Sequence, residues 1–168
     1  QGAGCGGVLM ATVIRPATKA DLARLDAALR ALSADLGDRH RATAADLRAA
    51  GFGPLPAFRA MLALDGDATL GAAVFSPLYS TTRACPGAYV SDLWVAAPAR
   101  GTGLGARLLA AVRDEARALW GAGFLRLAVY ADNPRAMAFY ERLGFAPRSG
   151  ETAMILEGAA FDRIGDMA

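Results

Sequence analysis

The residues whose types and spacing could do chemistry start with a glycine-rich loop, Arg100-Gly101-Thr102-Gly103-Leu104-Gly105-Ala106. Three glycines at alternate positions let backbone N–H groups approach an anion, because no side chain stands in the way. A helix that begins inside the loop adds free N–H groups and the positive end of its dipole. This pattern predicts phosphate oxygens as the ligand. A tight strand-to-helix turn with no ligand accounts for the same glycines equally well.

Other phosphate, metal and disulfide chemistries do not fit the sequence. The three loop glycines lack the GxGxxG spacing of dinucleotide-binding proteins, and the chain contains no GxxxxGK[ST] segment. Cys5 and Cys85 are too few and too far apart for a disulfide framework. His40 is the single histidine and has no CxxC or HxxxH neighbours. We therefore expect a protein without a metal.

The elements that must position the loop can be read from the spacing of apolar residues. Four amphipathic stretches predict helices: residue 19 to Leu36, a short one from Thr43 to Gly51, one from Leu104 to Gly121, and one from Asn133-Pro134 to Gly144. Apolar runs bounded by turn residues predict strands at Ala11–Arg15, Phe58–Leu64, Thr69–Tyr79, Ala88–Val95, Phe124–Val129, Ala146–Arg148 and Thr152–Leu156. The Asp65-Gly66-Asp67 turn predicts a hairpin between the second and third strands.

This order of elements predicts an α/β fold. We expect a mixed central sheet of about seven strands flanked by about four helices. The first half of the sheet should be antiparallel, and a parallel crossover should join the fourth and fifth strands. The 168 residues suffice for one domain, which we place at residues 10–168. Residues 1–9 are interpreted as a tag remnant or a disordered extension.

The composition of the chain argues against two classes of partner, membranes and nucleic acids. The chain is 54% hydrophobic and 20% charged, which is typical of a folded protein, and it has no apolar stretch long enough to span a membrane. Its net charge is +2 and its basic residues are nearly all arginine, with Lys19 the single lysine. A lysine-rich arm for nucleic acid is therefore missing. We expect a cytoplasmic protein that binds neither nucleic acid nor membrane.

Three segments together resemble the GNAT superfamily of N-acetyltransferases. Arg100 to Gly105 resembles its Arg/Gln-x-x-Gly-x-Gly/Ala signature, and Asp92-Leu93-Trp94-Val95 resembles the strand that precedes that signature. The segment from Asn133-Pro134 to Tyr140-Glu141-Arg142-Leu143-Gly144-Phe145 resembles its late Asn…Tyr-x-x-x-Gly-Phe signature. The resemblance covers roughly residues 11–157 and implies an acetyl-coenzyme-A-dependent enzyme with a single-domain GNAT-like fold.

Shorter segments are similar to the diamine acetyltransferases within that superfamily, which act on spermidine, spermine or thialysine. They are Gly51-Phe52-Gly53 with Pro56 and Phe58, Tyr79-Ser80-Thr81, and Tyr89-Val90-Ser91-Asp92. Polyamine enzymes typically carry paired acids where this chain has Ser91-Asp92. The resemblance implies a primary amine of a small molecule as acceptor, which could be a polyamine, a diamine or a thialysine-like amino acid. It also implies a homodimer.

The resemblance implies roles on the cofactor side. Acetyl-CoA, the co-substrate, would lie between the fourth and fifth strands, with its pyrophosphate on Gly101, Thr102, Gly103, Leu104, Gly105 and Ala106 beside Arg100. Backbone groups of Leu93, Trp94 and Val95 would hold the pantetheine arm, and one of their amides would polarise the thioester carbonyl. Asn133 would contact the cofactor from the opposite strand. Asn133 is also a helix cap, and Trp94 could equally be a core residue.

The resemblance also implies catalytic and acceptor-binding residues. Tyr140 matches the general acid of the superfamily, and its reference pKa of about 10 suits proton transfer to a thiolate. Asp92 is a candidate for attracting the ammonium and relaying its proton, or else a structural acid. Asp35 and Asp38 follow the first helix and could bind a distal ammonium, or simply be solvated. Two other functions stay open, acetylation of protein N-termini or lysines and non-catalytic binding of acyl-CoA.

Overall fold

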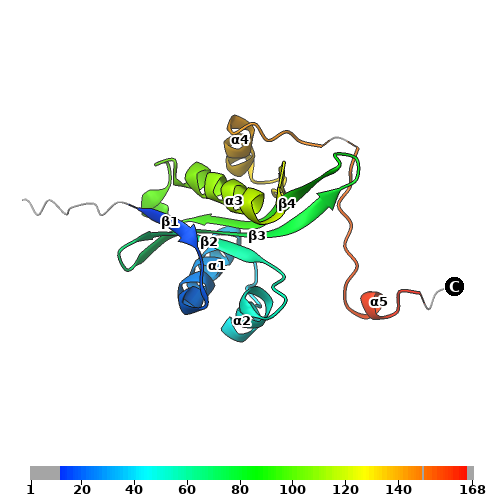
Figure 1. Cartoon of the computed structure of the whole chain (residues 1–168), viewed down its shortest axis with the longest axis horizontal. Helices are drawn as coiled ribbons and strands as arrows, with labels where there is room; N and C mark the ends of the chain where they lie inside the picture. The colour runs from blue at the N-terminus through cyan, green and yellow to red at the C-terminus, as the bar shows by residue number, and fades with distance from the viewer. Residues whose placement is uncertain (1–11, 149, 166–168) are drawn as a thin grey trace, which may run out of the picture. The chain divides into compact units, whose positions relative to one another are not determined.

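The structure, a computed structural model, describes residues 12–148 and 150–165 (Figure 1). Its chain divides into two compact units, Gln1–Ala128 and Val129–Ala168. Residues 1–9, interpreted above as a tag remnant or extension, lie outside the described residues. Within the described ranges, no helix combines the length and apolar character needed to cross a membrane.

The first unit is built on one mixed sheet with the strand order β1-β2-β3-β4-β5. β1 to β4 pair antiparallel, whereas β4 and β5 pair parallel, as predicted. β2 and β3 form the predicted hairpin, because the two residues between them, Gly66 and Asp67, make a tight turn. The strands are β1 (Val13–Pro16), β2 (Arg59–Asp65), β3 (Ala68–Ser80), β4 (Cys85–Val95) and β5 (Leu125–Leu127).

Helices cover both faces of this sheet. Figure 1 shows α1 (Leu22–Leu36) and α2 (Ala44–Phe52) on one side and α3 (Leu104–Trp120) on the other. On the α1 side, buried residues from α1, α2, β2 and β3 form one hydrophobic cluster that includes Leu25, Leu62 and Val74. On the α3 side, the ring of Phe75 contacts that of Trp120 at 5.8 Å between centroids. The sheet is therefore the middle layer of three.

The predicted helix starts are confirmed by their hydrogen bonds. Thr18 donates its N–H and its hydroxyl to Asp21 Oδ2, both at 2.8 Å, which leads through a short 3-10 turn (Lys19–Asp21) into α1. Thr43 and Asp46 make the same reciprocal pair at the start of α2. A second 3-10 turn, Ala97–Ala99, connects β4 to the glycine loop. α3 ends before Gly121, as predicted.

The second unit contains two helices, α4 (Pro134–Arg142) and α5 (Ala159–Asp162). Asn133 Oδ1 accepts the N–H of Ala136 at 3.0 Å, and Pro134 is the first helical residue. Both are the start signals predicted from the sequence. α5 was not predicted, because its four residues are too few to show a helical period.

The predicted count of about seven strands is wrong for the described residues, which form five. Residues 146–148 and 152–156 form no strand, and Met154 and Ile155 are 93% and 82% exposed. An apolar run becomes a strand only when a neighbouring strand satisfies its backbone groups, and a sequence pattern does not supply that neighbour. The predicted strand Phe124–Val129 shortens to Leu125–Leu127, because only three β4 residues pair with it.

Candidate active site

The glycine loop forms an open cradle at the start of α3. Gly101 and Gly103 have φ of 80° and 81°, a region that favours glycine, and a Cβ on either would meet no atom within 4 Å. The hydroxyl of Thr102 donates to Ala99 O at 2.7 Å, which turns that side chain back toward the preceding residues. The loop backbone is therefore accessible to a ligand, because no neighbouring atom blocks the approach to Gly101 or Gly103.

Three amides of this cradle precede the helical hydrogen-bond ladder. The first helical bond of α3 joins the N–H of Arg107 to Gly103 O at 3.1 Å. The N–H groups of Leu104, Gly105 and Ala106 come before it, and the N-cap residue Gly103 provides no side-chain acceptor. Such amides, at the positive end of a helix of 17 residues, suit an anionic oxygen.

Arg100 marks the entrance to the cradle, and its side chain is fixed by two contacts. Its Nε–H donates to Val95 O at 2.9 Å, at the end of β4. Its Nη2 donates to Asp35 Oδ2 at 2.5 Å, near the end of α1. The guanidinium therefore joins the cradle to both the sheet and the helix layer.

The pairing of β4 with its neighbouring strands changes at Ser91. Val90 pairs with Phe75 and Asp92 pairs with Val74, so Ser91 is an extra residue that makes a β-bulge. β5 pairs with β4 only at residues 88–90. Beyond the bulge, Ser91–Val95 has β3 on one side and no strand of the described residues on the other. A stretch of backbone edge is thus open between the sheet and the cradle.

Asp92 lies on this open stretch and faces the α1 layer. Its cross-strand partner Val74 belongs to the hydrophobic cluster under α1 and α2, and directly opposed residues share a face of the sheet. Its Oδ2 accepts the hydroxyl hydrogen of Ser91 at 2.7 Å. Asp92 is only half-buried, so its carboxylate remains reachable from solvent.

Trp94 and Asp35 form a pair above the same face. The indole of Trp94 packs against the α1-side cluster, and its Nε1–H donates to Asp35 Oδ2 at 3.2 Å. Trp94 is therefore partly a core residue, the alternative left open by the sequence. Asp38 lies in the exposed turn after α1, where its N–H donates to Ser33 O at 2.8 Å.

Asn133 and Tyr140 belong to the second unit. Tyr140 is on the last turns of α4, where its ring contacts those of Phe139 and Phe145 at 5.1 and 5.6 Å between centroids. Burial raises the pKa of the Tyr140 phenol above its ordinary value. The phenol therefore holds its proton throughout the neutral range.

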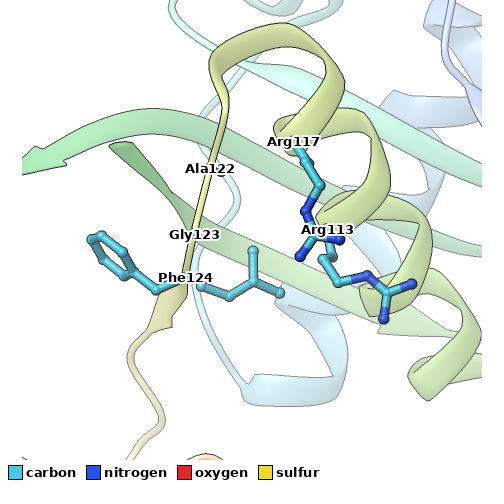
Figure 2. Close-up of a pocket in the computed structure, with 6 residues that line it drawn as sticks. Arg113, Arg117, Ala122, Gly123 and Phe124 are labelled. Atoms are coloured by element: carbon cyan, nitrogen blue, oxygen red, sulfur yellow. The ribbon is translucent and has the colours of Figure 1, made fainter. Parts of the chain in front are cut away.

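A separate hollow lies at the far end of α3 and is lined by none of the predicted site residues. Figure 2 shows Arg113 and Arg117 on the helix, beside the segment Ala122, Gly123 and Phe124 that leads into β5. Arg117 is in the last turn of α3, where a cation complements the helix dipole, so it has a structural explanation. Among the described residues, no group of three His, Cys, Asp or Glu could hold a metal ion.

Hydrogen bonds within the first unit thus join four of the predicted residues, Asp35, Trp94, Val95 and Arg100, and Asp92 lies on the same stretch of β4. Asp38, which was also predicted, lies in the exposed turn after α1. Sequence analysis missed two features. The bulge at Ser91 leaves no mark in the apolar spacing of β4, and the contact of Asp35 with Arg100 joins residues 65 positions apart. Only the folded arrangement could reveal either.

Comparisons with known proteins agree with this geometry. The model of the acetyltransferase (GNAT) family matches residues 25–145. A thialysine N-epsilon-acetyltransferase from Bos taurus is 30% identical over 142 residues, which cover 79% of this chain and 82% of that protein.

Solved structures share the fold. An integron cassette protein from V. cholerae has a TM-score of 0.75 at 22% identity and covers 92% of this chain and 98% of its own. An aminoglycoside acetyltransferase from a soil metagenome, in complex with sisomicin, has a TM-score of 0.72 at 17% identity, covering 87% and 97%. A ribosomal-protein-alanine N-acetyltransferase from Brucella melitensis has 0.71 at 19%, covering 87% and 100%. The match to the family model and the 30% identity to the Bos taurus enzyme show that the chain belongs to the acetyltransferase (GNAT) family.

Proposed function

We propose that this protein transfers an acetyl group from acetyl-CoA to a primary amine of a small molecule. The observation that carries the proposal is the open edge of β4 beyond the Ser91 bulge, which leads directly to the glycine cradle. The GNAT family uses acetyl-CoA as co-substrate. The extended pantetheine arm of acetyl-CoA carries amide groups, which can pair with the free backbone groups of an open strand edge. The names of the relatives suggest a thialysine-like amino acid or an aminoglycoside as the amine, and the resemblance to diamine acetyltransferases adds a polyamine.

The cradle fits a diphosphate. The N–H groups of Leu104, Gly105 and Ala106, with the helix dipole behind them, suit its oxygens, and the open space at Gly101 and Gly103 allows close approach. The backbone of Leu93, Trp94 and Val95 would pair with the pantetheine amides, and one N–H there would polarise the thioester carbonyl. Thr102 and Asn133 would complete the contacts, and Asn133 would keep its role as the cap of α4.

Asp92 is proposed to receive the acceptor. An alkylammonium has a pKa of about 10.4 and must lose a proton before it can attack. The half-buried carboxylate of Asp92, on the open stretch of β4, would attract the cation and pass its proton to water. Asp38, in the exposed turn after α1, would contact a second ammonium of a diamine.

Tyr140 is proposed as the general acid. The amine nitrogen bonds to the carbonyl carbon of the acetyl group, the C–S bond breaks, and the departing thiolate takes a proton from the phenol. Since burial raises the pKa of Tyr140, the phenol is protonated and able to donate at neutral pH. The proton lost by the amine passes to water through Asp92, and a proton from water then restores the Tyr140 phenol, so the step balances.

A panel of amines tests the proposal. Purified protein with acetyl-CoA is given thialysine, lysine, spermidine, an aminoglycoside and a peptide with a free N-terminus. Thiol release and product mass are then measured. We expect acetylation of at least one small amine. Acetylation of the peptide alone would indicate a protein acetyltransferase instead, and cofactor binding without any product would contradict an enzyme.

Replacing Tyr140 by Phe separates catalysis from binding. The variant Tyr140→Phe keeps the ring that packs against Phe139 and Phe145 and removes only the proton donor. We expect kcat to fall by about 10²- to 10³-fold, the usual range for a lost general acid, with KM for acetyl-CoA within about twofold. A non-catalytic acyl-CoA-binding protein would show no turnover before or after the change. Unchanged kcat would remove Tyr140 from the mechanism.

A further inference from the structure

Three side chains from different elements meet at one carboxylate oxygen. Asp35 Oδ2 accepts a hydrogen bond from Arg100 Nη2 at 2.5 Å and another from Trp94 Nε1 at 3.2 Å. Asp35 is on the last turn of α1, Trp94 is near the end of β4, and Arg100 opens the glycine loop. The resulting Asp35–Trp94–Arg100 cluster lies entirely within the first unit.

This arrangement argues against Asp35 as a contact for a distal ammonium. Its Oδ2 already has two donors, one of them a guanidinium, and an incoming ammonium would have to compete with that cation. The side chains of Arg100 and Asp35 are 38% and 43% exposed, so the pair lies at the surface, and hydrogen bonds rather than burial hold Arg100 in place. The carboxylate therefore has a partner that belongs to the cofactor side of the site.

The contacts also fix where the guanidinium can point. Arg100 donates Nε–H to Val95 O and one Nη2 hydrogen to Asp35. A guanidinium has five N–H donors in a rigid fork, so three remain after these two bonds. Because two of its edges are anchored, the remaining donors of the Arg100 guanidinium have a set direction. A fixed cation loses less side-chain entropy when it binds an anion than a mobile one.

We propose that Asp35 is a positioning residue for cofactor binding, which holds Arg100 and Trp94 at the junction of β4 and the glycine cradle. The inference deepens the proposed function and rests on it. Asp35 itself would touch neither the diphosphate nor the amine. It would act through the Arg100 fork and through the Trp94 indole, whose backbone lies in the stretch assigned to the pantetheine arm.

The test compares Asp35→Asn with Asp35→Glu and with Asp114→Asn. Asp114 is an exposed acid on α3 that pairs with its neighbour Arg113, so its replacement removes one charge away from the cluster. Calorimetry gives the Kd of coenzyme A, and steady-state kinetics give separate KM values for acetyl-CoA and for the amine. We expect Asp35→Asn to raise the Kd and the KM for acetyl-CoA about tenfold, the effect of one charge-assisted hydrogen bond. The amine KM should change less than twofold, Asp35→Glu should recover part of the loss, and Asp114→Asn should match the parent.

Fluorescence adds a readout independent of activity. In a Trp120→Phe background Trp94 is the single tryptophan, and loss of its hydrogen bond in Asp35→Asn should shift its emission. Arg100→Lys keeps the charge but lacks the fork, so it should weaken coenzyme A binding even if Asp35→Asn fails to fold. Where Asp35→Asn folds, adding it to Arg100→Lys should weaken coenzyme A binding by less than the tenfold loss that it causes alone.

Three outcomes would overturn the inference. A raised amine KM with unchanged coenzyme A binding would make Asp35 an acceptor contact, as the sequence suggested. Tighter coenzyme A binding by Asp35→Asn would mean that the carboxylate opposes the diphosphate. Equal losses of coenzyme A affinity in Asp35→Asn and Asp114→Asn would show that the effect comes from the net charge of the protein and not from the position of Asp35. Failure of the unmodified protein to bind coenzyme A is different, since it would reject the proposed function itself.

Discussion

At the residue scale, Asp21 is a buried carboxylate that accepts several hydrogen bonds. It is 5% exposed and receives two hydrogen bonds from the Arg15 guanidinium at 2.7 Å, together with the N–H and hydroxyl of Thr18. The Arg15 hydrogen bonds are the main cause that holds the pKa of Asp21 well below its usual range, and they outweigh the opposing effect of burial. Asp21 thereby ties β1 to the start of α1.

We predict that Asp21→Asn lowers the free energy of unfolding by roughly 1.5–3 kcal/mol at pH 7, since it removes a charged hydrogen-bond acceptor from a buried position. Because the Arg15 side chain is half-exposed, solvent screens its ion pair with Asp21 and limits the loss of unfolding free energy to this range. Because the folded pKa lies below the unfolded value of about 3.9, ionised Asp21 stabilises the fold fully above that pH. The contribution declines as the pH falls below about 4 and is lost as the pH passes through the folded pKa, so the stabilities of the two proteins should approach each other over that range. Urea titrations at several pH values measure this.

The matched control is Asp46→Asn. Asp46 makes the same capping bonds with Thr43 at the start of α2, and they lower its pKa. It is exposed, however, and pairs with no arginine in the described part of the chain. Its replacement should destabilise the chain less than Asp21→Asn does. Equal losses from the two variants would show that helix capping, rather than the buried ion pair, accounts for the effect.

At the element scale, the single extra residue in β4 decides where the sheet opens. With Ser91 inserted, β4 departs from regular pairing after Val90, the residue at which its pairing with β5 stops. Bulges bend a strand and increase its twist. The open stretch at Leu93–Val95 is therefore attributed to Ser91 rather than to any side chain of that stretch.

Deleting Ser91 tests this explanation. The deletion leaves Val90 opposite Phe75 and Asp92 opposite Val74 in a regular ladder, so we expect a folded protein with an unchanged or higher melting temperature. Coenzyme A binding should fall at least tenfold, because a straight β4 keeps its edge close to β5. Ser91→Ala removes only the hydroxyl bond to Asp92 and should bind coenzyme A normally. Normal binding by the deletion variant would show that the bulge does not create the site.

At the scale of the whole molecule, the second unit carries several exposed apolar side chains. Met154, Ile155, Phe161 and Ile164 are 62% exposed or more, and all lie in the second unit. We propose that they contribute to an interface between two copies, in line with the homodimer implied by the resemblance to diamine acetyltransferases. Buried apolar area is the general source of affinity in such interfaces.

Sedimentation measures the assembly. We predict a dimer at micromolar concentration, and a shift to monomer for Ile155→Asp, since burying an unpaired carboxylate is costly. Leu55→Asp is the control, because Leu55 is also exposed, at 90%, but belongs to the first unit and lies far in the sequence from residues 154–164. A monomer for the unmodified protein would reject the proposal.

The sequence by itself determined what depends on neighbouring residues. Capping pairs such as Thr43 with Asp46 and the Asn133-Pro134 start are contacts over three or four positions, so spacing predicts them. The glycine cradle and the antiparallel first half of the sheet follow from the same kind of local signal. The three segments that resemble GNAT signatures are local patterns too, and the family that they imply is the one whose model matches residues 25–145.

Tertiary structure decided what depends on partners distant in the chain. The pattern at 152–156 could not reveal that no strand pairs with it, and the apolar run at Phe124–Val129 could not show that pairing stops after three residues. Asp35 looked like a solvated acid or an acceptor contact until folding placed Arg100 and Trp94 on it. Pairing and long-range contacts are set by which surfaces the packed layers bring together, and residue spacing carries no record of that.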